Sequence, residues 1–467
     1  MVGAGILFYL RSLVSMVFLG RLGQLPLAGG SLALGFANIT GYSVLSGLAG
    51  GMDPVCGQAF GAGRTDLLRA ALRRTVAVLA AASLPVALLW VAMHRVLVST
   101  GQDPEIAGAA YEYILCCLPD LAVQCLLHPI RIYLRAQSVT LPLTYGAAAA
   151  LLLHVPINFL LVTCLGLGVR GVALGGVWTN LNFLLFLLAY VYFTDDDDEE
   201  EDSTKTKEVE EWWPLVRLCV HSCMSVCLEW WWYEIMVLLC GVLVDPKAAV
   251  AAMGVLIQTT SLIYIFPHSL GCAVSTRVGH ELGAARPERA RLVARVGLGL
   301  GAALGLVACA FAVSVRGAWA RMFTDDAAIL RLTASALPLL GLAELGNCPQ
   351  TAGCGVLRGS ARPEKAARIN VSAFYGVGMP VALALAFWPL GLDFRGMWGG
   401  MLAAQLVCAG LMLRAVLGTD WAEQTERARQ LTGGRGDGIV AEDKPGHAQP
   451  AKAEVQQNTL FMVADCV

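Results

Sequence analysis

The octapeptide GQAFGAGR at 57–64 recurs as GHELGAAR at 279–286, which is an offset of 222 residues. The two copies align without a gap, and both keep the two glycines and the closing arginine. The same register continues downstream: LRAQ (134–137) matches LRGS (357–360), Pro156 matches Pro380, and RGVALGG (170–176) resembles RGMWGGM (395–401), at offsets of 223, 224 and 225. Chance would not hold one register through four landmarks, so the sequence predicts two homologous halves.

The composition around this repeat is that of a membrane protein. Hydrophobic residues make up 57% of the 467-residue chain, charged residues only 15%, and the mean hydropathy is +0.63. A helix needs about 20 apolar residues to cross a hydrocarbon core roughly 30 Å thick. Twelve such stretches are present, at 1–20, 27–50, 74–97, 107–132, 141–163, 169–193, 214–243, 248–274, 292–316, 327–355, 366–390 and 396–417. They lack the alternation of a membrane β-barrel, so the predicted fold is all-α.

Twelve spans divide into two halves of six, and this predicts the domain organisation. Because six is even, both halves have the same orientation, so they are related by a pseudo-twofold axis along the membrane normal. We expect an N-lobe at 1–193, an acidic cytoplasmic linker at 194–213 that contains TDDDDEEED, a C-lobe at 214–417 and a disordered cytoplasmic tail at 418–467. Internal repeats of this kind are typical of transporters that work by alternating access.

The distribution of lysine and arginine predicts the orientation. The connections after the even-numbered spans are the more basic ones, and by the positive-inside rule they and both termini face the cytoplasm. The basic residues are divided among five loops rather than gathered on one domain, which argues against nucleic-acid binding.

No Walker A sequence, clustered catalytic set or metal-ligand pattern is present, so we expect neither an enzyme nor a cofactor or metal site. The fifteen cysteines lie mostly within spans, where packing is their simplest role.

The stretch CLEWWWYEIMVLLC (227–240) places two acids inside an apolar span. Glu229 is 15 residues beyond Pro214, which puts it about 22 Å along the helix and close to the bilayer midplane. A charged acid costs about 2.5–3.5 kcal/mol there, so intramembrane acids usually face a cavity and carry function. At 100° per residue, Glu234 points about 140° away from Glu229, whereas Tyr233 is only about 40° away. We therefore expect Glu229 and Tyr233 to face one cavity.

Five motifs together resemble one known family. They are GMDPVCGQAFGAGR (51–64), HPIRIYLRAQ (128–137), CLEWWWYEIMVLLCG (227–241), STRVGHELGAARP (275–287) and ELGNCPQTAGCGVLRGSARP (344–363). In content, order and spacing they are similar to the multidrug and toxic compound extrusion (MATE) transporters, above all to the plant DETOXIFICATION branch, over residues 1–417. The resemblance implies a twelve-helix, two-lobed antiporter that exports organic solutes in exchange for protons.

Further candidates come from the second half of the chain. Glu344 and Asn347 lie one turn apart in the tenth span, and Gln350 extends the same face. Similar MATE proteins commonly have an acid in this span, and the matching position here is Asn347, so either Glu344 or Asn347 could be the working residue. Gln258 stands where some animal relatives have an acid. We name Glu229, Glu234 and Glu344 as candidates for proton coupling, and Tyr233, Gln258, Asn347 and Gln350 for solute binding.

The first half departs from the pattern of some prokaryotic relatives, which place a proton-binding aspartate in the first span. This chain has Arg11, Ser12 and Ser15 there instead. Its main intramembrane acids are Asp120, which we expect to pair with a basic group such as Arg11, and Asp53, which we interpret as a helix-end or loop contact. The histidines His128, His154 and His268 are interpreted as structural.

These observations predict a proton-coupled antiporter for organic solutes or xenobiotics, driven by a proton gradient. Because a cation and a proton would compete for one carboxylate, cationic or neutral solutes are favoured. Export of organic anions such as citrate, export of a hormone, or a channel remain the alternatives. The expected partners are a small organic solute, protons and the lipid bilayer, and the expected assembly is a monomer. The sequence does not choose among plasma, vacuolar and Golgi or endosomal membranes.

Overall fold

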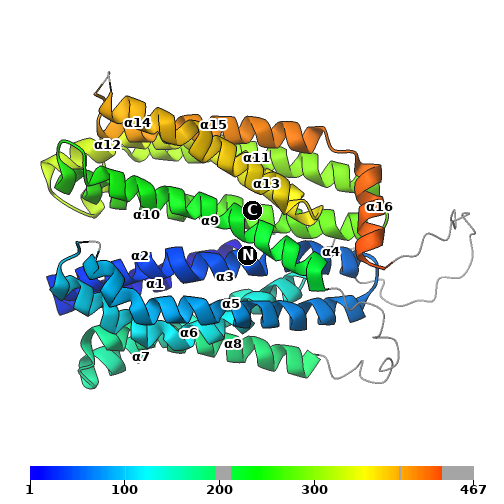
Figure 1. Cartoon of the computed structure of the whole chain (residues 1–467), viewed down its shortest axis with the longest axis horizontal. Helices are drawn as coiled ribbons and strands as arrows, with labels where there is room; N and C mark the ends of the chain where they lie inside the picture. Colours follow the sequence, from blue (N-terminus) through cyan, green and yellow to red (C-terminus); the bar gives the residue numbers. More distant parts are fainter. Residues whose placement is uncertain (100, 195–211, 389–390, 434–467) are drawn as a thin grey trace, which may run out of the picture. The chain divides into compact units, whose positions relative to one another are not determined.

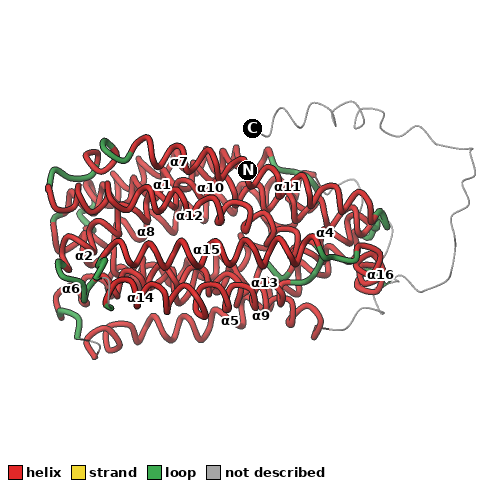
Figure 2. The backbone as a smooth tube through the Cα atoms, turned by 90° about the horizontal axis from the view of Figure 1, so that it is seen from above, coloured by secondary structure: helices red, strands yellow, loops and turns green. Residues whose placement is uncertain are grey.

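Helices make up the fold throughout the part of the chain that the computed structural model describes, residues 1–99, 101–194, 212–388 and 391–433. In that part no strand occurs, and twelve helical stretches are long and apolar enough to cross a membrane. They are Val2–Leu22, Gln24–Gly61, Thr65–Ser99, Pro104–Ala136, Leu141–Cys164, Gly168–Thr194, Trp212–Cys240, Pro246–Gly283, Pro287–Val315, Ala327–Gly359, Pro363–Phe387 and Phe394–Leu417. The predicted all-α membrane fold is confirmed, and Figure 2 shows the loops gathered at the two ends of the helices.

Some spans are single helices and others are divided. In chain order the α-helices are α1 (Val2–Leu22), α2 (Gln24–Ala37), α3 (Ser43–Ala49), α4 (Met52–Gly61), α5 (Thr65–Ser99), α6 (Pro104–Ala136), α7 (Leu141–Asn158), α8 (Gly168–Thr194), α9 (Trp212–Cys240), α10 (Pro246–Gly283), α11 (Pro287–Val315), α12 (Ala327–Gly359), α13 (Pro363–Asn370), α14 (Met379–Phe387), α15 (Phe394–Leu417) and α16 (Trp421–Leu431). Wider π-helical turns interrupt the second, fifth and eleventh spans at Asn38–Tyr42, Phe159–Cys164 and Val371–Gly378. A 3₁₀ turn, Trp319–Met322, precedes α12.

The helices form two bundles, α1–α8 and α9–α15, seen in Figure 1 as the blue-to-cyan and the green-to-orange helices. Each bundle has its own apolar core, with Trp90 and Phe183 fully buried in the first and Trp232 and Phe374 in the second. Large apolar side chains such as Leu84, Leu152, Leu238 and Val307 lie exposed on the outer surface. An apolar surface of this kind suits a protein whose solvent is lipid rather than water.

The repeated octapeptides meet each other where α4 crosses α10. A Cβ built on Gly57 would lie 3.4 Å from the Cα of Gly279, and a Cβ built on Gly279 would lie 3.1 Å from the Cα of Gly57. A Cβ on Gly61 would lie 2.2 Å from the His280 carbonyl oxygen, and one on Gly283 would lie 2.0 Å from that of Gln58. The glycines therefore let the backbones of α4 and α10 approach each other closely.

Two hydrogen bonds between the bundles are related in the same reciprocal way as the glycine contacts. The Gln58 side-chain amide donates to the carbonyl oxygen of Gly359 at 3.0 Å, and His280 Nε2 donates to that of Ala136 at 2.7 Å. Gln58 corresponds to His280 at an offset of 222, and Ala136 to Gly359 at 223. Because each contact has a counterpart with the roles of the bundles exchanged, the interface follows the pseudo-twofold relation predicted from the repeat.

Cys219, Ser222 and Cys223 on α9 supply a second contact between the bundles. Gly47, Gly50 and Gly51 bring the second span within van der Waals contact of Cys223, Ser222 and Cys219 respectively. A Cβ on Gly51 would lie 2.4 Å from the backbone of Cys219, so only glycine fits there. Cys219 itself is fully buried, in agreement with the packing role assigned to it.

The tail expectation is wrong for part of residues 418–467, because Trp421–Leu431 forms α16. Asp420 caps this helix by accepting from the backbone N–H groups of Ala422 and Glu423. Trp421, Thr425 and Ala428 form its buried face against α10 and α11. That spacing of i, i+4, i+7 is an amphipathic helical pattern that the sequence analysis overlooked. The rest of the predicted tail, and 195–211 of the predicted acidic linker, lie outside the described residues.

Candidate functional site

Glu229 and Glu234 lie on different faces of α9, as the helical geometry predicts. Glu229 is partly buried and touches groups on α10 and α12, whereas Glu234, among the described residues, has no hydrogen-bond or ion-pair partner. Trp232 packs in the core of the second bundle against Phe374, with ring centroids 5.7 Å apart. Trp231 donates from its indole Nε1 to the carbonyl oxygen of Ile39 in the first bundle at 3.1 Å, so it joins the two bundles.

A chain of polar groups connects Glu229 to the tenth span. Its carboxylate is in hydrogen-bonding contact with the Gln350 side chain and in electrostatic contact with His268 and Arg358. Glu344, buried one turn and a half before Gln350 on α12, interacts electrostatically with Glu229. The structure therefore brings two acids from α9 and α12 to one place inside the second bundle.

Glu344 has its own hydrogen-bond donors. Asn347 Nδ2 donates to Glu344 Oε2 at 2.8 Å, and the Cys348 thiol lies 3.7 Å from the same oxygen. Gln405 Nε2 on α15 in turn donates to Asn347 Oδ1 at 3.4 Å. Glu344 and Asn347, the two alternatives of the sequence analysis, are thus hydrogen-bonded to each other, and Asn347 orients the carboxyl group of Glu344.

Tyr233 and Gln258, the other candidates, have different surroundings. Tyr233 lies in electrostatic contact with both Glu229 and Glu344, as expected from its place one turn after Glu229. Gln258 is partly exposed on α10. Within the described chain it makes no hydrogen bond to the acids. The structure thus gathers Glu229, Tyr233, Glu344, Asn347 and Gln350, and leaves Gln258 and Glu234 outside the cluster.

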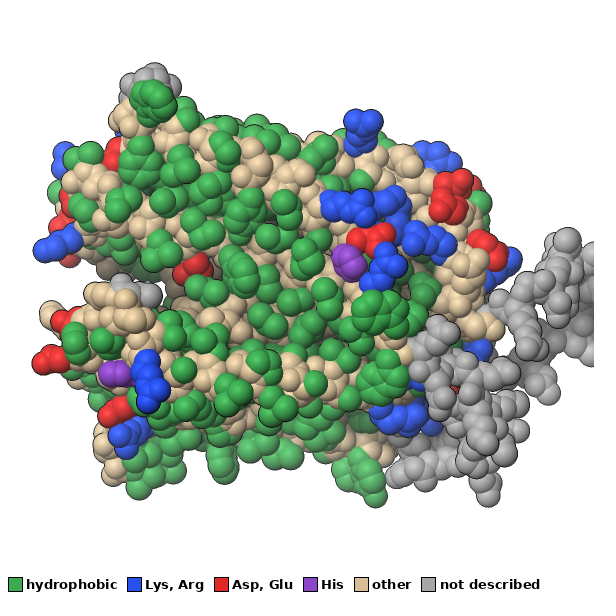
Figure 3. All heavy atoms as spheres, in the orientation of Figure 1, with side chains coloured by type: hydrophobic (Ala, Val, Ile, Leu, Met, Phe, Trp, Pro, Cys, Tyr) green, Lys and Arg blue, Asp and Glu red, His purple; other side chains and the backbone are tan. Residues whose placement is uncertain are grey.

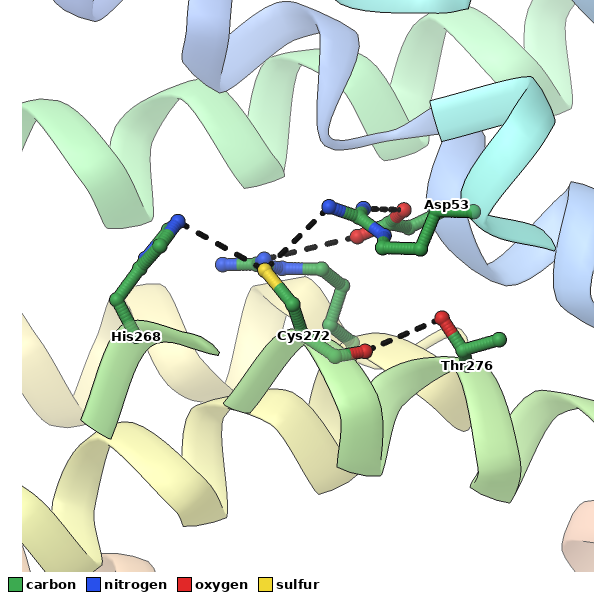
Figure 4. A network of polar contacts seen from close by, with 6 residues as sticks. Asp53, His268, Cys272 and Thr276 are labelled. Atoms are coloured by element: carbon green, nitrogen blue, oxygen red, sulfur yellow. Dashed lines mark hydrogen bonds and ion pairs between the residues drawn. The ribbon is translucent and has the colours of Figure 1, made fainter. Parts of the chain in front are cut away.

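Asp53 is the centre of an ion cluster between the bundles, shown in Figure 4. One carboxylate oxygen accepts a hydrogen bond from Arg135 on α6, and the other lies 3.6 Å from the guanidinium of Arg358 on α12. Cys272 Sγ on α10 lies 3.4 Å from Arg135 and 3.7 Å from His268 Nε2. Asp53 lies in the first turn of α4, in line with its interpretation as a helix-end residue, and its carboxylate in addition bridges arginines of both bundles.

A second buried polar cluster lies in the first bundle. Asp120 accepts from Asn180 Nδ2 at 2.8 Å and from Gln124 at 3.3 Å, and Tyr42 hydrogen bonds to the same carboxyl group. Arg11 donates a hydrogen bond to the Asn180 side-chain oxygen and interacts electrostatically with Asp120. The expected pairing of Asp120 with Arg11 is therefore relayed through Asn180.

Sequence reasoning missed Asn180 and the neighbours of His154. His154 is fully buried, 3.1 Å from Ser15 Oγ and 2.7 Å from Thr179 Oγ1. Asn158, Thr179 and Asn180 are polar residues within apolar spans, and that alone marks them as groups that need partners.

The two bundles touch mainly in one half of their length. The contacts of α3 and α4 with α9 and α10 lie towards the end that carries α16, which we call the α16 end. At the opposite end, Figure 3 shows the surface hollowed between the bundles. The molecule is thus closed between its bundles at the α16 end, where the Asp53 cluster lies, and open at the other end.

Buried Arg362 helps to hold the α16 end together. Its guanidinium donates to Ser360 Oγ and to Thr419 Oγ1, both at 3.0 Å, so it ties the loop before α13 to the loop before α16. Burial lowers the pKa of Arg362 to about 10, and the side chain therefore still carries its charge at neutral pH.

Comparison with known proteins places this arrangement in a family. The family model described as MatE matches residues 1–160 and 222–384. DETOXIFICATION 49 of Arabidopsis thaliana is 57% identical over 91% of this chain and 85% of its own length, and DETOXIFICATION 48 of the same plant is 54% identical over 92% and 80%. The crystal structure of the eukaryotic MATE transporter AtDTX14 superposes with a TM-score of 0.87 at 30% identity, covering 92% of this chain and 96% of the other. The chain belongs to the MATE family of membrane transporters and, within it, groups with the plant DETOXIFICATION proteins.

Proposed function

We propose that the protein is a proton-coupled antiporter that exports small organic solutes by alternating access. The observation that carries the proposal is the meeting of Glu229 and Glu344 inside the second bundle, with Gln350 and Asn347 as hydrogen-bond partners. A membrane efflux transporter needs an energy source, and two acids at mid-membrane depth supply a group that a proton can charge or neutralise.

The physical basis is the repulsion of two carboxylates in a medium of low dielectric constant. Two carboxylates that interact electrostatically there cannot both be charged at low cost, so a proton on one of them stabilises the pair. Loading and release of that proton changes the charge of the interior by one unit. Such a change favours one arrangement of the bundles over the other and couples the proton gradient to solute movement.

The two-bundle architecture supports the alternating-access part of the proposal. The bundles touch through glycines at the α16 end and separate at the other end, so a rocking motion would exchange the open and closed ends. Because the basic loops lie at the α16 end, we propose that this end and both termini face the cytoplasm, and that the protein acts as a monomer. No cofactor is required beyond the proton gradient.

Charge removal at Glu229 tests the coupling. In proteoliposomes with an imposed pH gradient and a panel of cationic, neutral and anionic solutes, we expect Glu229→Gln to abolish gradient-driven uptake while the protein remains folded and inserted. Glu234→Gln, which changes an acid of the same helix outside the cluster, should have a milder effect. Glu112→Gln, at an exposed surface ion pair with Arg170, is the neutral control. Full gradient-driven transport by Glu229→Gln would move the coupling site to Glu344 or Asp120.

A further inference from the structure

Two arginines of the first bundle share one aromatic ring within the membrane-spanning helices. The guanidinium carbon of Arg131 on α6 lies 5.1 Å from the centre of the Phe8 ring, and that of Arg11 on α1 lies 5.8 Å from it. Arg11 stands near the middle of α1, and Arg131 lies five residues before the end of α6 at Ala136. Both residues are partly exposed.

Arg131 lacks an acidic partner in the part of the chain that the structure describes. The charged groups nearest to it are Arg135 and Arg11, which repel it, together with the thiol of Cys272. The other arginines of this region are compensated, because Arg135 and Arg358 share Asp53 and because Arg11 reaches Asp120 through Asn180. With the Glu229 carboxylate beside Arg358, four guanidinium groups face three carboxylates, which leaves one positive charge in excess.

An uncompensated arginine inside a membrane protein needs a physical explanation. Insertion of a charged side chain into the hydrocarbon core is costly. A cation–π contact offsets part of this cost, and here a single ring serves two cations. Packing alone therefore explains the pair poorly, whereas an anion that neutralises the excess charge explains it directly. A guanidinium fork also matches the two oxygens of a carboxylate or sulfonate.

We propose that Arg131 and Arg11, both beside Phe8, bind the anionic group of the exported solute, and that the solutes of this transporter are therefore organic anions of the carboxylate or sulfonate class. This inference rests on the proposed export function and names its substrate class. It replaces the cationic or neutral solutes that Glu229 alone suggested. Protons then bind in the second bundle and the solute in the first, and the two are coupled through the motion of the bundles rather than by competition for one carboxylate.

Two probes of equal ring size and opposite permanent charge test the proposal. Binding of 2-naphthalenesulfonate and of N-methylquinolinium to the purified full-length protein is measured by calorimetry without a pH gradient. We expect the sulfonate to bind the more tightly. Arg131→Gln should weaken sulfonate binding at least tenfold and leave N-methylquinolinium binding unchanged, while Arg131→Lys, which keeps the charge but loses the fork, should lie between. Arg170→Gln, an exposed arginine of the same bundle, should bind as the unchanged protein does.

The outcomes separate this proposal from the proposed function. Tighter binding of N-methylquinolinium, or equal sulfonate binding by the unchanged protein and by Arg131→Gln, would overturn the anion site. If Arg131→Gln did not fold, Arg11→Gln gives the same test on the partner guanidinium. Because the measurement uses no gradient, loss of proton coupling in Glu229→Gln would leave sulfonate binding in place, and intact coupling would not rescue a failed anion site.

Discussion

Individual glycines decide how closely the two bundles approach. Gly283 faces the Gln58 carbonyl oxygen and Gly61 faces that of His280, at distances that leave no room for a methyl group. Their neighbours are backbone atoms, which cannot rotate away as a side chain can. These positions are sensitive for steric reasons alone and not because of backbone dihedral angles, since both glycines are helical.

Alanine at Gly283 should therefore destabilise the closed α16 end. We expect Gly283→Ala and Gly61→Ala each to destabilise the protein by about 1–3 kcal/mol, because overpacking a tight interface costs that much. Each variant should therefore have a lower melting temperature in detergent. Gly299→Ala is the matched control, since a Cβ there meets no atom within 4 Å. Equal melting temperatures for Gly283→Ala and Gly299→Ala would show that the interface is looser than the structure has it.

At the scale of the element, α16 is a short helix that closes the α16 end. Trp421 packs into a small core with Val278, Ala290 and Val416, from α10, α11 and α15. Arg64 adds a bond from the α4–α5 turn to the carbonyl oxygen of Thr432, just after α16, at 3.0 Å. The helix therefore connects both bundles at one end, although it crosses no membrane.

Two truncated chains distinguish the contribution of α16 to stability from that of the residues after it. A chain that ends after Gly433 should keep the melting temperature and transport rate of the full chain. A chain that ends after Gly418 loses the Trp421 core and the Arg64–Thr432 contact, and should melt several degrees lower. Thermal melting in detergent, read by tryptophan fluorescence, checks both. Identical melting of the two truncated chains would mean that α16 contributes no stability.

At the scale of the whole molecule, the ion pairs of Asp53 connect the two bundles at the α16 end. The Asp53 side chain is 6% exposed and binds Arg135 of its own bundle and Arg358 of the other. Charge attraction therefore adds to the glycine contacts that hold this end closed. An ion pair so deeply buried is sensitive to the loss of one partner, because the remaining charges stay uncompensated.

Asp53→Asn should consequently loosen the closed end. We expect faster hydrogen–deuterium exchange in α4 and in the Gly279 half of α10, because two arginines would be left without a carboxylate between them. Asp66→Asn, which breaks an exposed pair with Arg64 within one bundle, is the control and should leave these segments unchanged. Unaltered exchange in Asp53→Asn would show that the glycine packing alone keeps this end shut.

The sequence was sufficient for the features that leave a periodic or repeated signal. The repeat at 57–64 and 279–286 predicted two related bundles, and apolar length predicted twelve spans, because lipid imposes both length and composition on every span. The helical angle between Glu229 and Glu234 was enough to separate their faces. The partners of these residues were less accessible to sequence reasoning. Asp53 meets Arg358 across 305 positions of chain, and Asn180 meets Arg11 across 169, so only the packed structure shows these pairs.

The reciprocal contact of the two octapeptides also bears on ancestry. Each copy packs against the other through equivalent glycines, so a half-length chain with one copy could form the same contact with a second molecule of itself. Two identical six-helix chains, inserted in the same direction, would make a homodimer of this shape, and gene fusion would then join them. Fusion frees the copies to diverge, and Asp53 stands opposite Ser275 in the repeat. A homodimer would present two such aspartates to two arginines, whereas the single chain retains one aspartate. The fused protein therefore has a charge asymmetry that a symmetric homodimer could not have.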